Sequence, residues 1–183
     1  RPEPKIPFSS SYKLSSNKVK QFIQFQNIFF KNNLTRGKFS FLNTAITRFS
    51  KSLDDVHVED ILLDNVISLE SMYSANESEL SFKFSIRVAS LLGRNPNEMK
   101  KLQKFMYEIY DLRSRIIHGD HVPDIVGDED YNMKKEDAID FLDEITRNSI
   151  KIFLTMINDF DSDALIQKEI QNSLYDSQIR KNL

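Results

Sequence analysis

The residues with the clearest capacity for chemistry are Arg113 and His118, which stand five positions apart in the chain. A histidine with an unperturbed pKa of about 6.5 accepts or donates a proton at neutral pH. A guanidinium stays charged, binds phosphate oxygens in a fork and stabilises the charge that grows on them in a pentacoordinate transition state. This pair suits RNA cleavage by attack of a 2′-hydroxyl on the adjacent phosphate, a reaction that requires no metal.

The spacing of these residues limits how they act together. Positions five apart on an ideal helix differ by about 140°, so Arg113 and His118 do not share a face. Ser114 and Arg115 stand four and three positions before His118 and do share a face with it, so we expect both to assist. Either Arg113 reaches around the helix, or one site takes its arginine and its histidine from two chains.

The sequence around the pair resembles a known family. The segment 110–119, YDLRSRIIHG, resembles the R-x4-H motif of the HEPN superfamily in its Apea-like branch. There an acidic or aromatic residue, Leu, Arg, Ser, a basic residue and two aliphatic residues precede His-Gly. The run 77–89, ESELSFKFSIRVA, also resembles that branch, and the whole resemblance covers roughly residues 58–158. Active HEPN nucleases often have Asn, Asp or His directly after the motif arginine, and here that residue is Ser114.

The resemblance implies a fold, an activity and partners. The fold is an up-and-down helical bundle of HEPN type with extra N-terminal and C-terminal helices. The activity is that of a metal-independent endoribonuclease that needs no cofactor, with Arg113 and His118 as the catalytic residues. The partners are RNA, a second copy of the chain that completes a shared cleft, and an inhibitory protein of the kind found in toxin–antitoxin or phage-defence systems.

Four other side chains are candidates for binding RNA. Lys83 and Arg87 stand four positions apart on one predicted helix, where we expect them to share an exposed stripe. Tyr107 and Tyr110 flank the motif and are candidates for stacking on a base. Each has a plainer interpretation, because two basic residues also form an ordinary solvated face and two tyrosines also pack within a dimer interface.

Arg113 and His118 also have interpretations without catalysis. Arg113 would pair with Asp111 or Glu108 on the helix surface, and His118 would stabilise the negative end of the helix. For the protein as a whole, one alternative is a catalytically inactive HEPN-like module that binds RNA, a nucleotide or a protein. The other is a structural dimerisation domain of a larger protein, which the linker-like start of the chain favours.

The composition excludes several classes of protein. The 183 residues carry a formal net charge of −2, unlike the strongly basic balance of a non-specific nucleic-acid binder. The absence of cysteine rules out thiolate metal sites and disulfides and favours a reducing, cytoplasmic location. No run approaches the ~18 apolar residues of a membrane helix, so we expect no membrane partner. We also expect no metal site. The chain begins with Arg1, which is typical of a fragment or a processed form.

Apolar periodicity predicts an all-α fold. With 4 glycines and 5 prolines, the chain has few residues for the tight turns of an all-β protein. We expect an extended segment over 1–15, a single helical domain over 16–160, and a C-terminal helix with a frayed tail over 161–183. The predicted helices are 16–33, 39–53, 58–73, 77–92, 96–118, 133–156 and 163–176, with a loop over 120–132.

Local signals predict several helix ends. Asn95 as N-cap, with Glu98 three residues later, starts the helix that carries the motif, and Gly119 ends it. Asp54 or Asp55 is expected to cap the helix that begins near residue 58. The first predicted helix is dense in apolar residues, so we expect it to be buried on a broad face.

Overall fold

The computed structural model describes residues 15–31, 39–73, 80–128, 131–160 and 162–173. These residues contain seven α-helices and one two-stranded antiparallel hairpin. The predicted all-α fold is therefore confirmed. In chain order the elements are α1 (Ser16–Lys31), α2 (Ser40–Asp54), α3 (Val58–Tyr73), α4 (Leu80–Leu92), α5 (Pro96–Ile117), β1 (Ile125–Asp128), β2 (Tyr131–Lys134), α6 (Lys135–Met156) and α7 (Asp163–Ser173).

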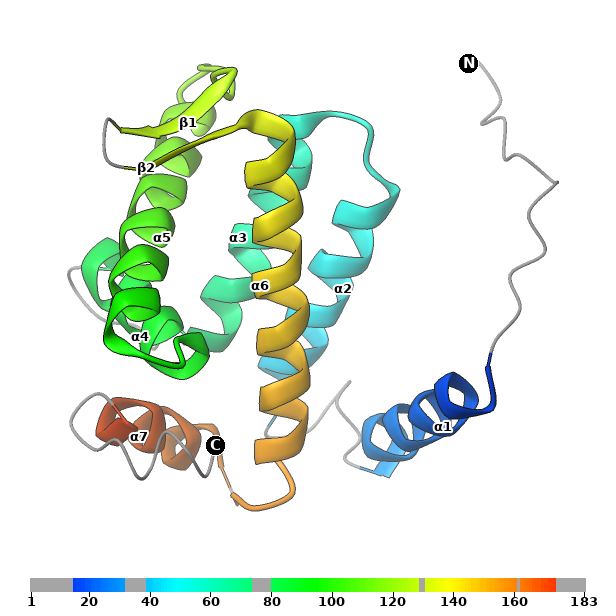
Figure 1. Ribbon diagram of the computed structural model, residues 1–183. Coiled ribbons are helices and arrows are strands. Elements are labelled where there is room, and N and C mark those ends of the chain that lie inside the picture. The colour runs from blue at the N-terminus through cyan, green and yellow to red at the C-terminus, as the bar shows by residue number, and fades with distance from the viewer. Residues whose placement is uncertain (1–14, 32–38, 74–79, 129–130, 161, 174–183) are drawn as a thin grey trace, which may run out of the picture.

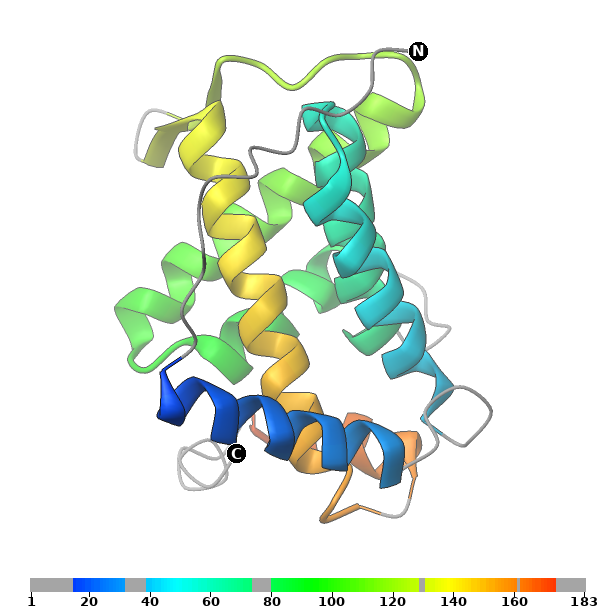
Figure 2. The same ribbon diagram turned by 90° about the vertical axis from the view of Figure 1, so that its right-hand side faces the viewer.

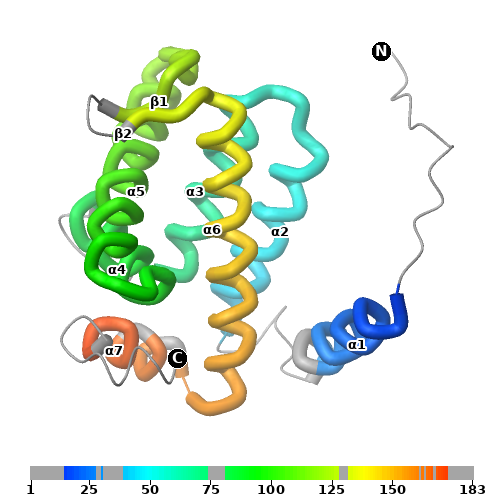
Figure 3. The backbone as a smooth tube through the Cα atoms, in the orientation of Figure 1, coloured from blue at the N-terminus to red at the C-terminus, as the bar shows by residue number. Residues whose placement is uncertain are grey.

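The helices form a bundle with α3 and α6 in the middle. α2 stands on one side of them, and the pair α4 and α5 stands on the other (Figure 1). α2 packs chiefly on α3 and α4 packs chiefly on α5, so each pair is a hairpin of helices that follow one another in the chain. The tube view shows α7 below this bundle, next to α4, with which it is in contact (Figure 3).

Aromatic and aliphatic side chains fill the centre of the bundle. The ring of Tyr73 meets that of Phe153 edge-on, with the ring centroids 5.1 Å apart. The Tyr73 hydroxyl donates a hydrogen bond to Oγ of Ser149 at 3.0 Å, which satisfies the only polar atom that this side chain brings into the core. Ile166 and Ile170 of α7 belong to the same core, so α7 packs as part of the bundle.

Helix α5 begins and ends where the sequence predicts. Oδ1 of Asn95 accepts a hydrogen bond from the backbone N–H of Glu98 at 3.0 Å. At the other end Gly119 has a φ of +100°, a conformation that glycine adopts without strain. The N–H of Asp120 donates to the carbonyl of Arg115 at 3.1 Å, the long bond of a Schellman motif.

Helix α1 is less buried than expected. The prediction of a broad buried face is wrong, because Phe22, Ile23 and Phe30 are 54%, 49% and 73% exposed. α1 crosses beside the C-terminal end of α6 (Figure 2). Phe25 reaches an apolar cavity of about 190 Å³ that α1 shares with α2 and α6. The apolar residues of α1 are only loosely periodic, so this one contact leaves most of them uncovered.

The segment predicted as a loop after α5 contains a hairpin. β1 and β2 pair antiparallel, with Val126 opposite Met133, and Gly127 has a φ of +110°. Val122 and Val126 are buried, so the segment covers the core beside the end of α5. The loop prediction failed because strands of four residues are too short for a clear alternating pattern.

Neither Asp54 nor Asp55 caps α3, so that prediction is wrong. Asp54 is the last residue of α2. Asp55 is the C-cap of α2, and its N–H donates to the carbonyl of Lys51 at 3.2 Å. The first turn of α3 closes instead on His57, whose carbonyl accepts from the N–H of Ile61 at 3.0 Å. The connection between the helices is so short that both aspartates are used by the end of α2.

Replacing Gly93 by alanine is expected to destabilise the turn between α4 and α5. An added Cβ would lie 2.5 Å from Cγ of Met99 and 2.7 Å from the carbonyl oxygen of Ala89. Overpacking of this kind costs about 1–3 kcal/mol. Urea unfolding followed by circular dichroism measures the change. Lys100→Ala, at an exposed position of α5, serves as the control and should stay within about 0.5 kcal/mol of wild type.

Candidate functional site

The C-terminal end of α5 carries the four residues predicted to form the site. The helix is continuous through Ile117, and His118 is its C-cap, with its backbone N–H donating to the carbonyl of Arg115 at 3.0 Å. Because the helix is unbroken, the separation of about 140° between positions 113 and 118 holds within one chain. Arg113 and His118 therefore do not lie on one face of α5.

Arg113 points toward α3. Its Nη2 lies 3.5 Å from Oε2 of Glu70, and its guanidinium carbon lies 5.7 Å from the centroid of the Tyr110 ring. The side chain is 28% exposed, and its Nε is buried without a hydrogen-bond partner among the described residues. The interpretation in which Arg113 pairs with Asp111 or Glu108 is wrong, because its acidic partner comes from α3. The guanidinium is held between two helices, yet one of its donors is unsatisfied.

Glu70 and Tyr110 complete a closed set of contacts around this arginine. The Tyr110 ring lies 5.7 Å from the guanidinium carbon of Arg113, and the Tyr110 hydroxyl is close enough to Glu70 to influence the pKa of that carboxylate. Burial raises the pKa of Glu70, although the charge of Arg113 and the Tyr110 hydroxyl act in the opposite direction. Burial also raises the pKa of Tyr110, and the neighbouring Glu70 charge adds to that effect.

Ser114, Arg115 and His118 are exposed at the end of the helix. Nε of Arg115 lies 3.1 Å from Oδ2 of Asp120, and its Nη1 lies 3.9 Å from Oδ2 of Asp111. Arg115 is thus engaged with two surface carboxylates. The ring of His118 makes no hydrogen bond to any residue that the structure describes. Ser114 and His118 share one exposed face of α5, as their spacing predicts.

The structure separates the four predicted RNA-binding residues. The prediction that Lys83 and Arg87 share an exposed stripe is wrong, because Arg87 is 5% exposed. Its Nη1 donates to the carbonyl of Tyr73 at 2.8 Å, so this guanidinium is used at the end of α3. Tyr107 is 53% exposed and lies on the same face of α5 as Ser114 and His118. Tyr110 is half-buried in the contacts with Glu70 and Arg113 described above.

Glu70 is the member of this cluster that the sequence analysis missed. It lies 43 positions before Arg113, so no local pattern connects the two residues. One signal was present, because Glu70 directly follows Leu69 in the apolar stripe of α3. A carboxylate at the edge of such a stripe is partly desolvated, and it needs a donor from the helix packed against it.

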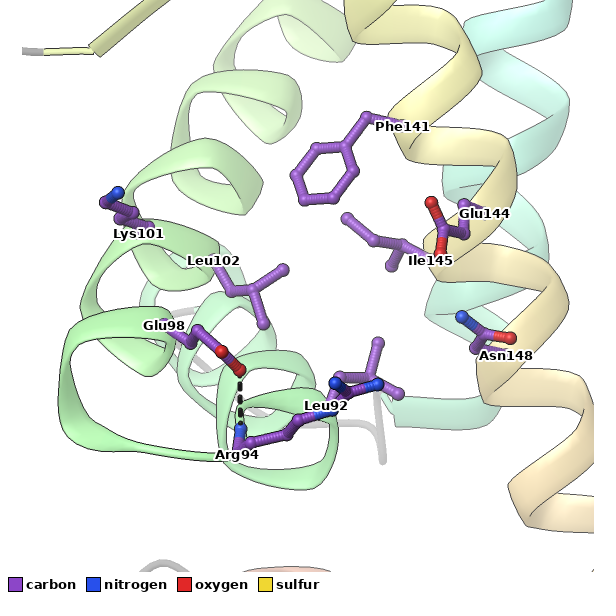
Figure 4. Close-up of a pocket in the computed structure, with 9 residues that line it drawn as sticks. All are labelled: Leu92, Arg94, Glu98, Lys101, Leu102, Phe141, Glu144, Ile145 and Asn148. Carbon is purple, nitrogen blue, oxygen red and sulfur yellow. Dashed lines mark hydrogen bonds between the residues drawn. The ribbon is translucent and has the colours of Figure 1, made fainter.

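A cavity lies elsewhere in the molecule, between the start of α5 and the middle of α6 (Figure 4). Its volume is about 320 Å³, and Leu102, Phe141 and Ile145 form its apolar wall. Arg94 runs along one side, and its backbone N–H donates to Oε2 of Glu98 at 3.0 Å. At about 1.5 Å per residue, the length of α5 puts this cavity roughly 30 Å from His118. It is therefore not part of the cluster around Arg113.

Two further observations concern metals and membranes. In the described ranges there is no group of three or more His, Cys, Asp or Glu side chains that could hold a metal ion. None of the helices in those ranges is long and apolar enough to cross a membrane.

Replacing Glu70 by glutamine is expected to change how stability depends on pH. Because its pKa is raised above the ordinary 4.5, the folded chain binds this proton more tightly than the unfolded chain. The resulting stability is fully present below the unfolded pKa and is lost as the pH rises through the folded pKa. Between about pH 4 and pH 7, wild type should lose stability relative to Glu70→Gln. Urea unfolding of both proteins at these pH values measures the difference, and a change of opposite sign would contradict the assignment.

Comparison of the chain with protein-family models, with curated proteins and with solved structures gave no match. The resemblance to HEPN domains therefore depends on the segments 77–89 and 110–119 themselves.

Proposed function

We propose that this chain is a metal-independent endoribonuclease that acts as a homodimer, with Arg113 and His118 as its catalytic residues. The observation that carries the proposal is the state of Arg113. Its guanidinium contacts Glu70 and Tyr110, part of the side chain is exposed, and its buried Nε has no acceptor among the described residues. A buried donor without a partner costs about 1–3 kcal/mol, and an anion bound beside the guanidinium would supply the acceptor.

The proposed reaction needs two proton transfers. The 2′-oxygen of the ribose loses its proton and forms a bond to the adjacent phosphorus. The bond from phosphorus to the 5′-oxygen of the next nucleotide then breaks, and that oxygen takes up a proton. The products are a 2′,3′-cyclic phosphate and a 5′-hydroxyl end. His118 carries out one of the two transfers as general base or general acid, and Arg113 binds the phosphate and stabilises its growing negative charge.

A dimer resolves the problem of geometry. Arg113 lies at the seam between α3 and α5, whereas His118 lies on the exposed face of α5 that also carries Ser114. A second copy with its α5 nearby would place its own His118 beside the Arg113 of the first. In such a cleft Ser114 and Arg115 contact the RNA backbone, and the exposed ring of Tyr107 offers a surface on which a base stacks.

The test of the function is an RNA cleavage assay with EDTA present. The purified chain is incubated with end-labelled RNA and with the same oligonucleotide carrying 2′-deoxyribose at every position. We expect cleavage of the RNA alone, with cyclic phosphate ends. Cleavage of the deoxy substrate would contradict attack by the 2′-hydroxyl. Binding without cleavage would instead identify a catalytically inactive module that uses the same surface.

A further inference from the structure

The ion pair between Glu70 and Arg113 has longer geometry than several other ion pairs of the described residues. Its closest N···O distance is 3.5 Å, whereas Arg147 and Asp143 approach to 2.7 Å, typical of a charge-assisted hydrogen bond. Burial also desolvates the Glu70 carboxylate and raises its pKa. A partly buried ion pair with long geometry gains little stability, since desolvation offsets the attraction. Its contribution to stability therefore does not account for its presence.

The arrangement of Glu70, Tyr110 and Arg113 does restrict the orientation of the arginine side chain. Tyr110 and Arg113 stand three positions apart on α5 and share the face that meets α3. Glu70 approaches from α3, forms the ion pair with the guanidinium and lies near the hydroxyl of Tyr110. A free arginine side chain has several rotatable bonds and points in many directions. Here the Glu70 carboxylate and the Tyr110 ring contact the guanidinium from two sides and restrict it to the seam between α3 and α5.

We propose that Glu70, supported by Tyr110, is a positioning residue that holds the guanidinium of Arg113 in the orientation that receives an RNA phosphate. The proposal rests on the proposed function, because it assigns to Arg113 a phosphate as its ligand. Glu70 does not itself touch the RNA. It acts through Arg113 by removing the freedom that the side chain would otherwise lose when RNA binds.

A positioning role for Glu70 predicts a change in RNA affinity opposite in sign to the change that charge repulsion alone predicts. A carboxylate near a bound phosphate repels it, so removing the Glu70 charge should tighten RNA binding if charge were the only effect. If Glu70 positions Arg113, its removal should weaken binding even though a repulsive charge has gone. The sign of the change therefore separates the two effects.

The experiment measures the affinity of the full chain for a fluorescent, fully 2′-O-methylated RNA, which this reaction cannot cleave, by fluorescence anisotropy. Glu70→Ala should weaken binding by about tenfold, the size expected for one lost hydrogen bond to a charged group. Glu70→Gln keeps an acceptor oxygen for Arg113, so it should recover most of that loss. The matched control is Asp143→Ala, which removes the acidic partner of Arg147 and should leave the affinity unchanged.

A second variant tests the same role if the Glu70→Ala protein does not fold. Tyr110→Phe keeps the ring beside Arg113 and removes only the hydroxyl that lies near Glu70, so it should weaken binding by about threefold. Circular dichroism verifies that each variant is folded. Affinity that is unchanged or tighter in Glu70→Ala, or unchanged in Tyr110→Phe, would overturn the positioning role. If Arg113→Ala itself binds as tightly as wild type, the proposed function fails at that residue, whatever Glu70 does.

Discussion

Replacing His118 by alanine is expected to reduce RNA cleavage by about 10²–10⁴-fold, the contribution typical of one general acid or base. The side chain is exposed and the structure gives it no hydrogen bond to another described residue, so its loss should leave the free energy of unfolding unchanged. The measurement is the initial rate of RNA cleavage at saturating substrate, with urea unfolding of the same preparation. The control is His57→Ala, which removes another exposed histidine.

His118→Ala, combined with Arg113→Ala, also tests whether the site is shared between two chains. Arg113→Ala and His118→Ala are each expected to be inactive. When the two are unfolded together and refolded as a mixture, some dimers combine the intact Arg113 of one copy with the intact His118 of the other. Cleavage by the mixture should then exceed that of either variant alone. A mixture as inactive as its components would contradict a site built from two chains, and His118→Ala with wild-type activity would contradict catalysis by His118.

Replacing Phe153 by alanine is expected to cost about 3–5 kcal/mol, the range for removing a large buried aromatic side chain. Phe153 is fully buried, and its ring packs edge-on against Tyr73 at 5.1 Å and Phe41 at 6.0 Å. It joins α6 to α2 and α3 at the centre of the bundle, where the helices leave little room to close a cavity. Because a domain has about 5–15 kcal/mol of stability in total, this single change should remove a large part of it.

Urea unfolding followed by far-UV circular dichroism measures this effect. The control is Phe82→Ala, which removes a phenylalanine that is 52% exposed on α4 and should change the free energy of unfolding by about 0.5 kcal/mol or less. A loss below about 1 kcal/mol for Phe153→Ala would show that the core around Tyr73 is not packed as described.

The features that the sequence predicted correctly are those that depend on interactions between nearby residues. The boundaries of α5 depend on Asn95, Glu98 and Gly119, each of which acts within a few residues of its own position, and the structure confirms all three. The exposed face that carries Ser114 and His118 follows from helical spacing alone. Periodicity also predicted the helices α3 and α6, because a stripe of apolar residues on a long helix has to face the core.

Three of the failures share one physical cause, which is contact between residues far apart in the chain. Arg87 was expected on a solvated face, yet the end of α3 buries it and takes its donor at the Tyr73 carbonyl. Glu70 was not considered, because only the packing of α3 on α5 brings it to Arg113. The exposure of α1 likewise depends on where the bundle leaves room for it. Propensity and spacing carry no information about such contacts.

The pairing of α2 with α3 and of α4 with α5 bears on how the chain folds. Each pair joins neighbours in sequence through a short connection, so little chain entropy is lost when it forms. The contacts of α6 with α3 span much longer loops, such as the 76 positions between Tyr73 and Ser149. We therefore expect the two helical hairpins to form early and the docking of α6 between them to close the core. Topologies rich in such local contacts belong to the fast-folding class, with rates set by closure of the longest loop.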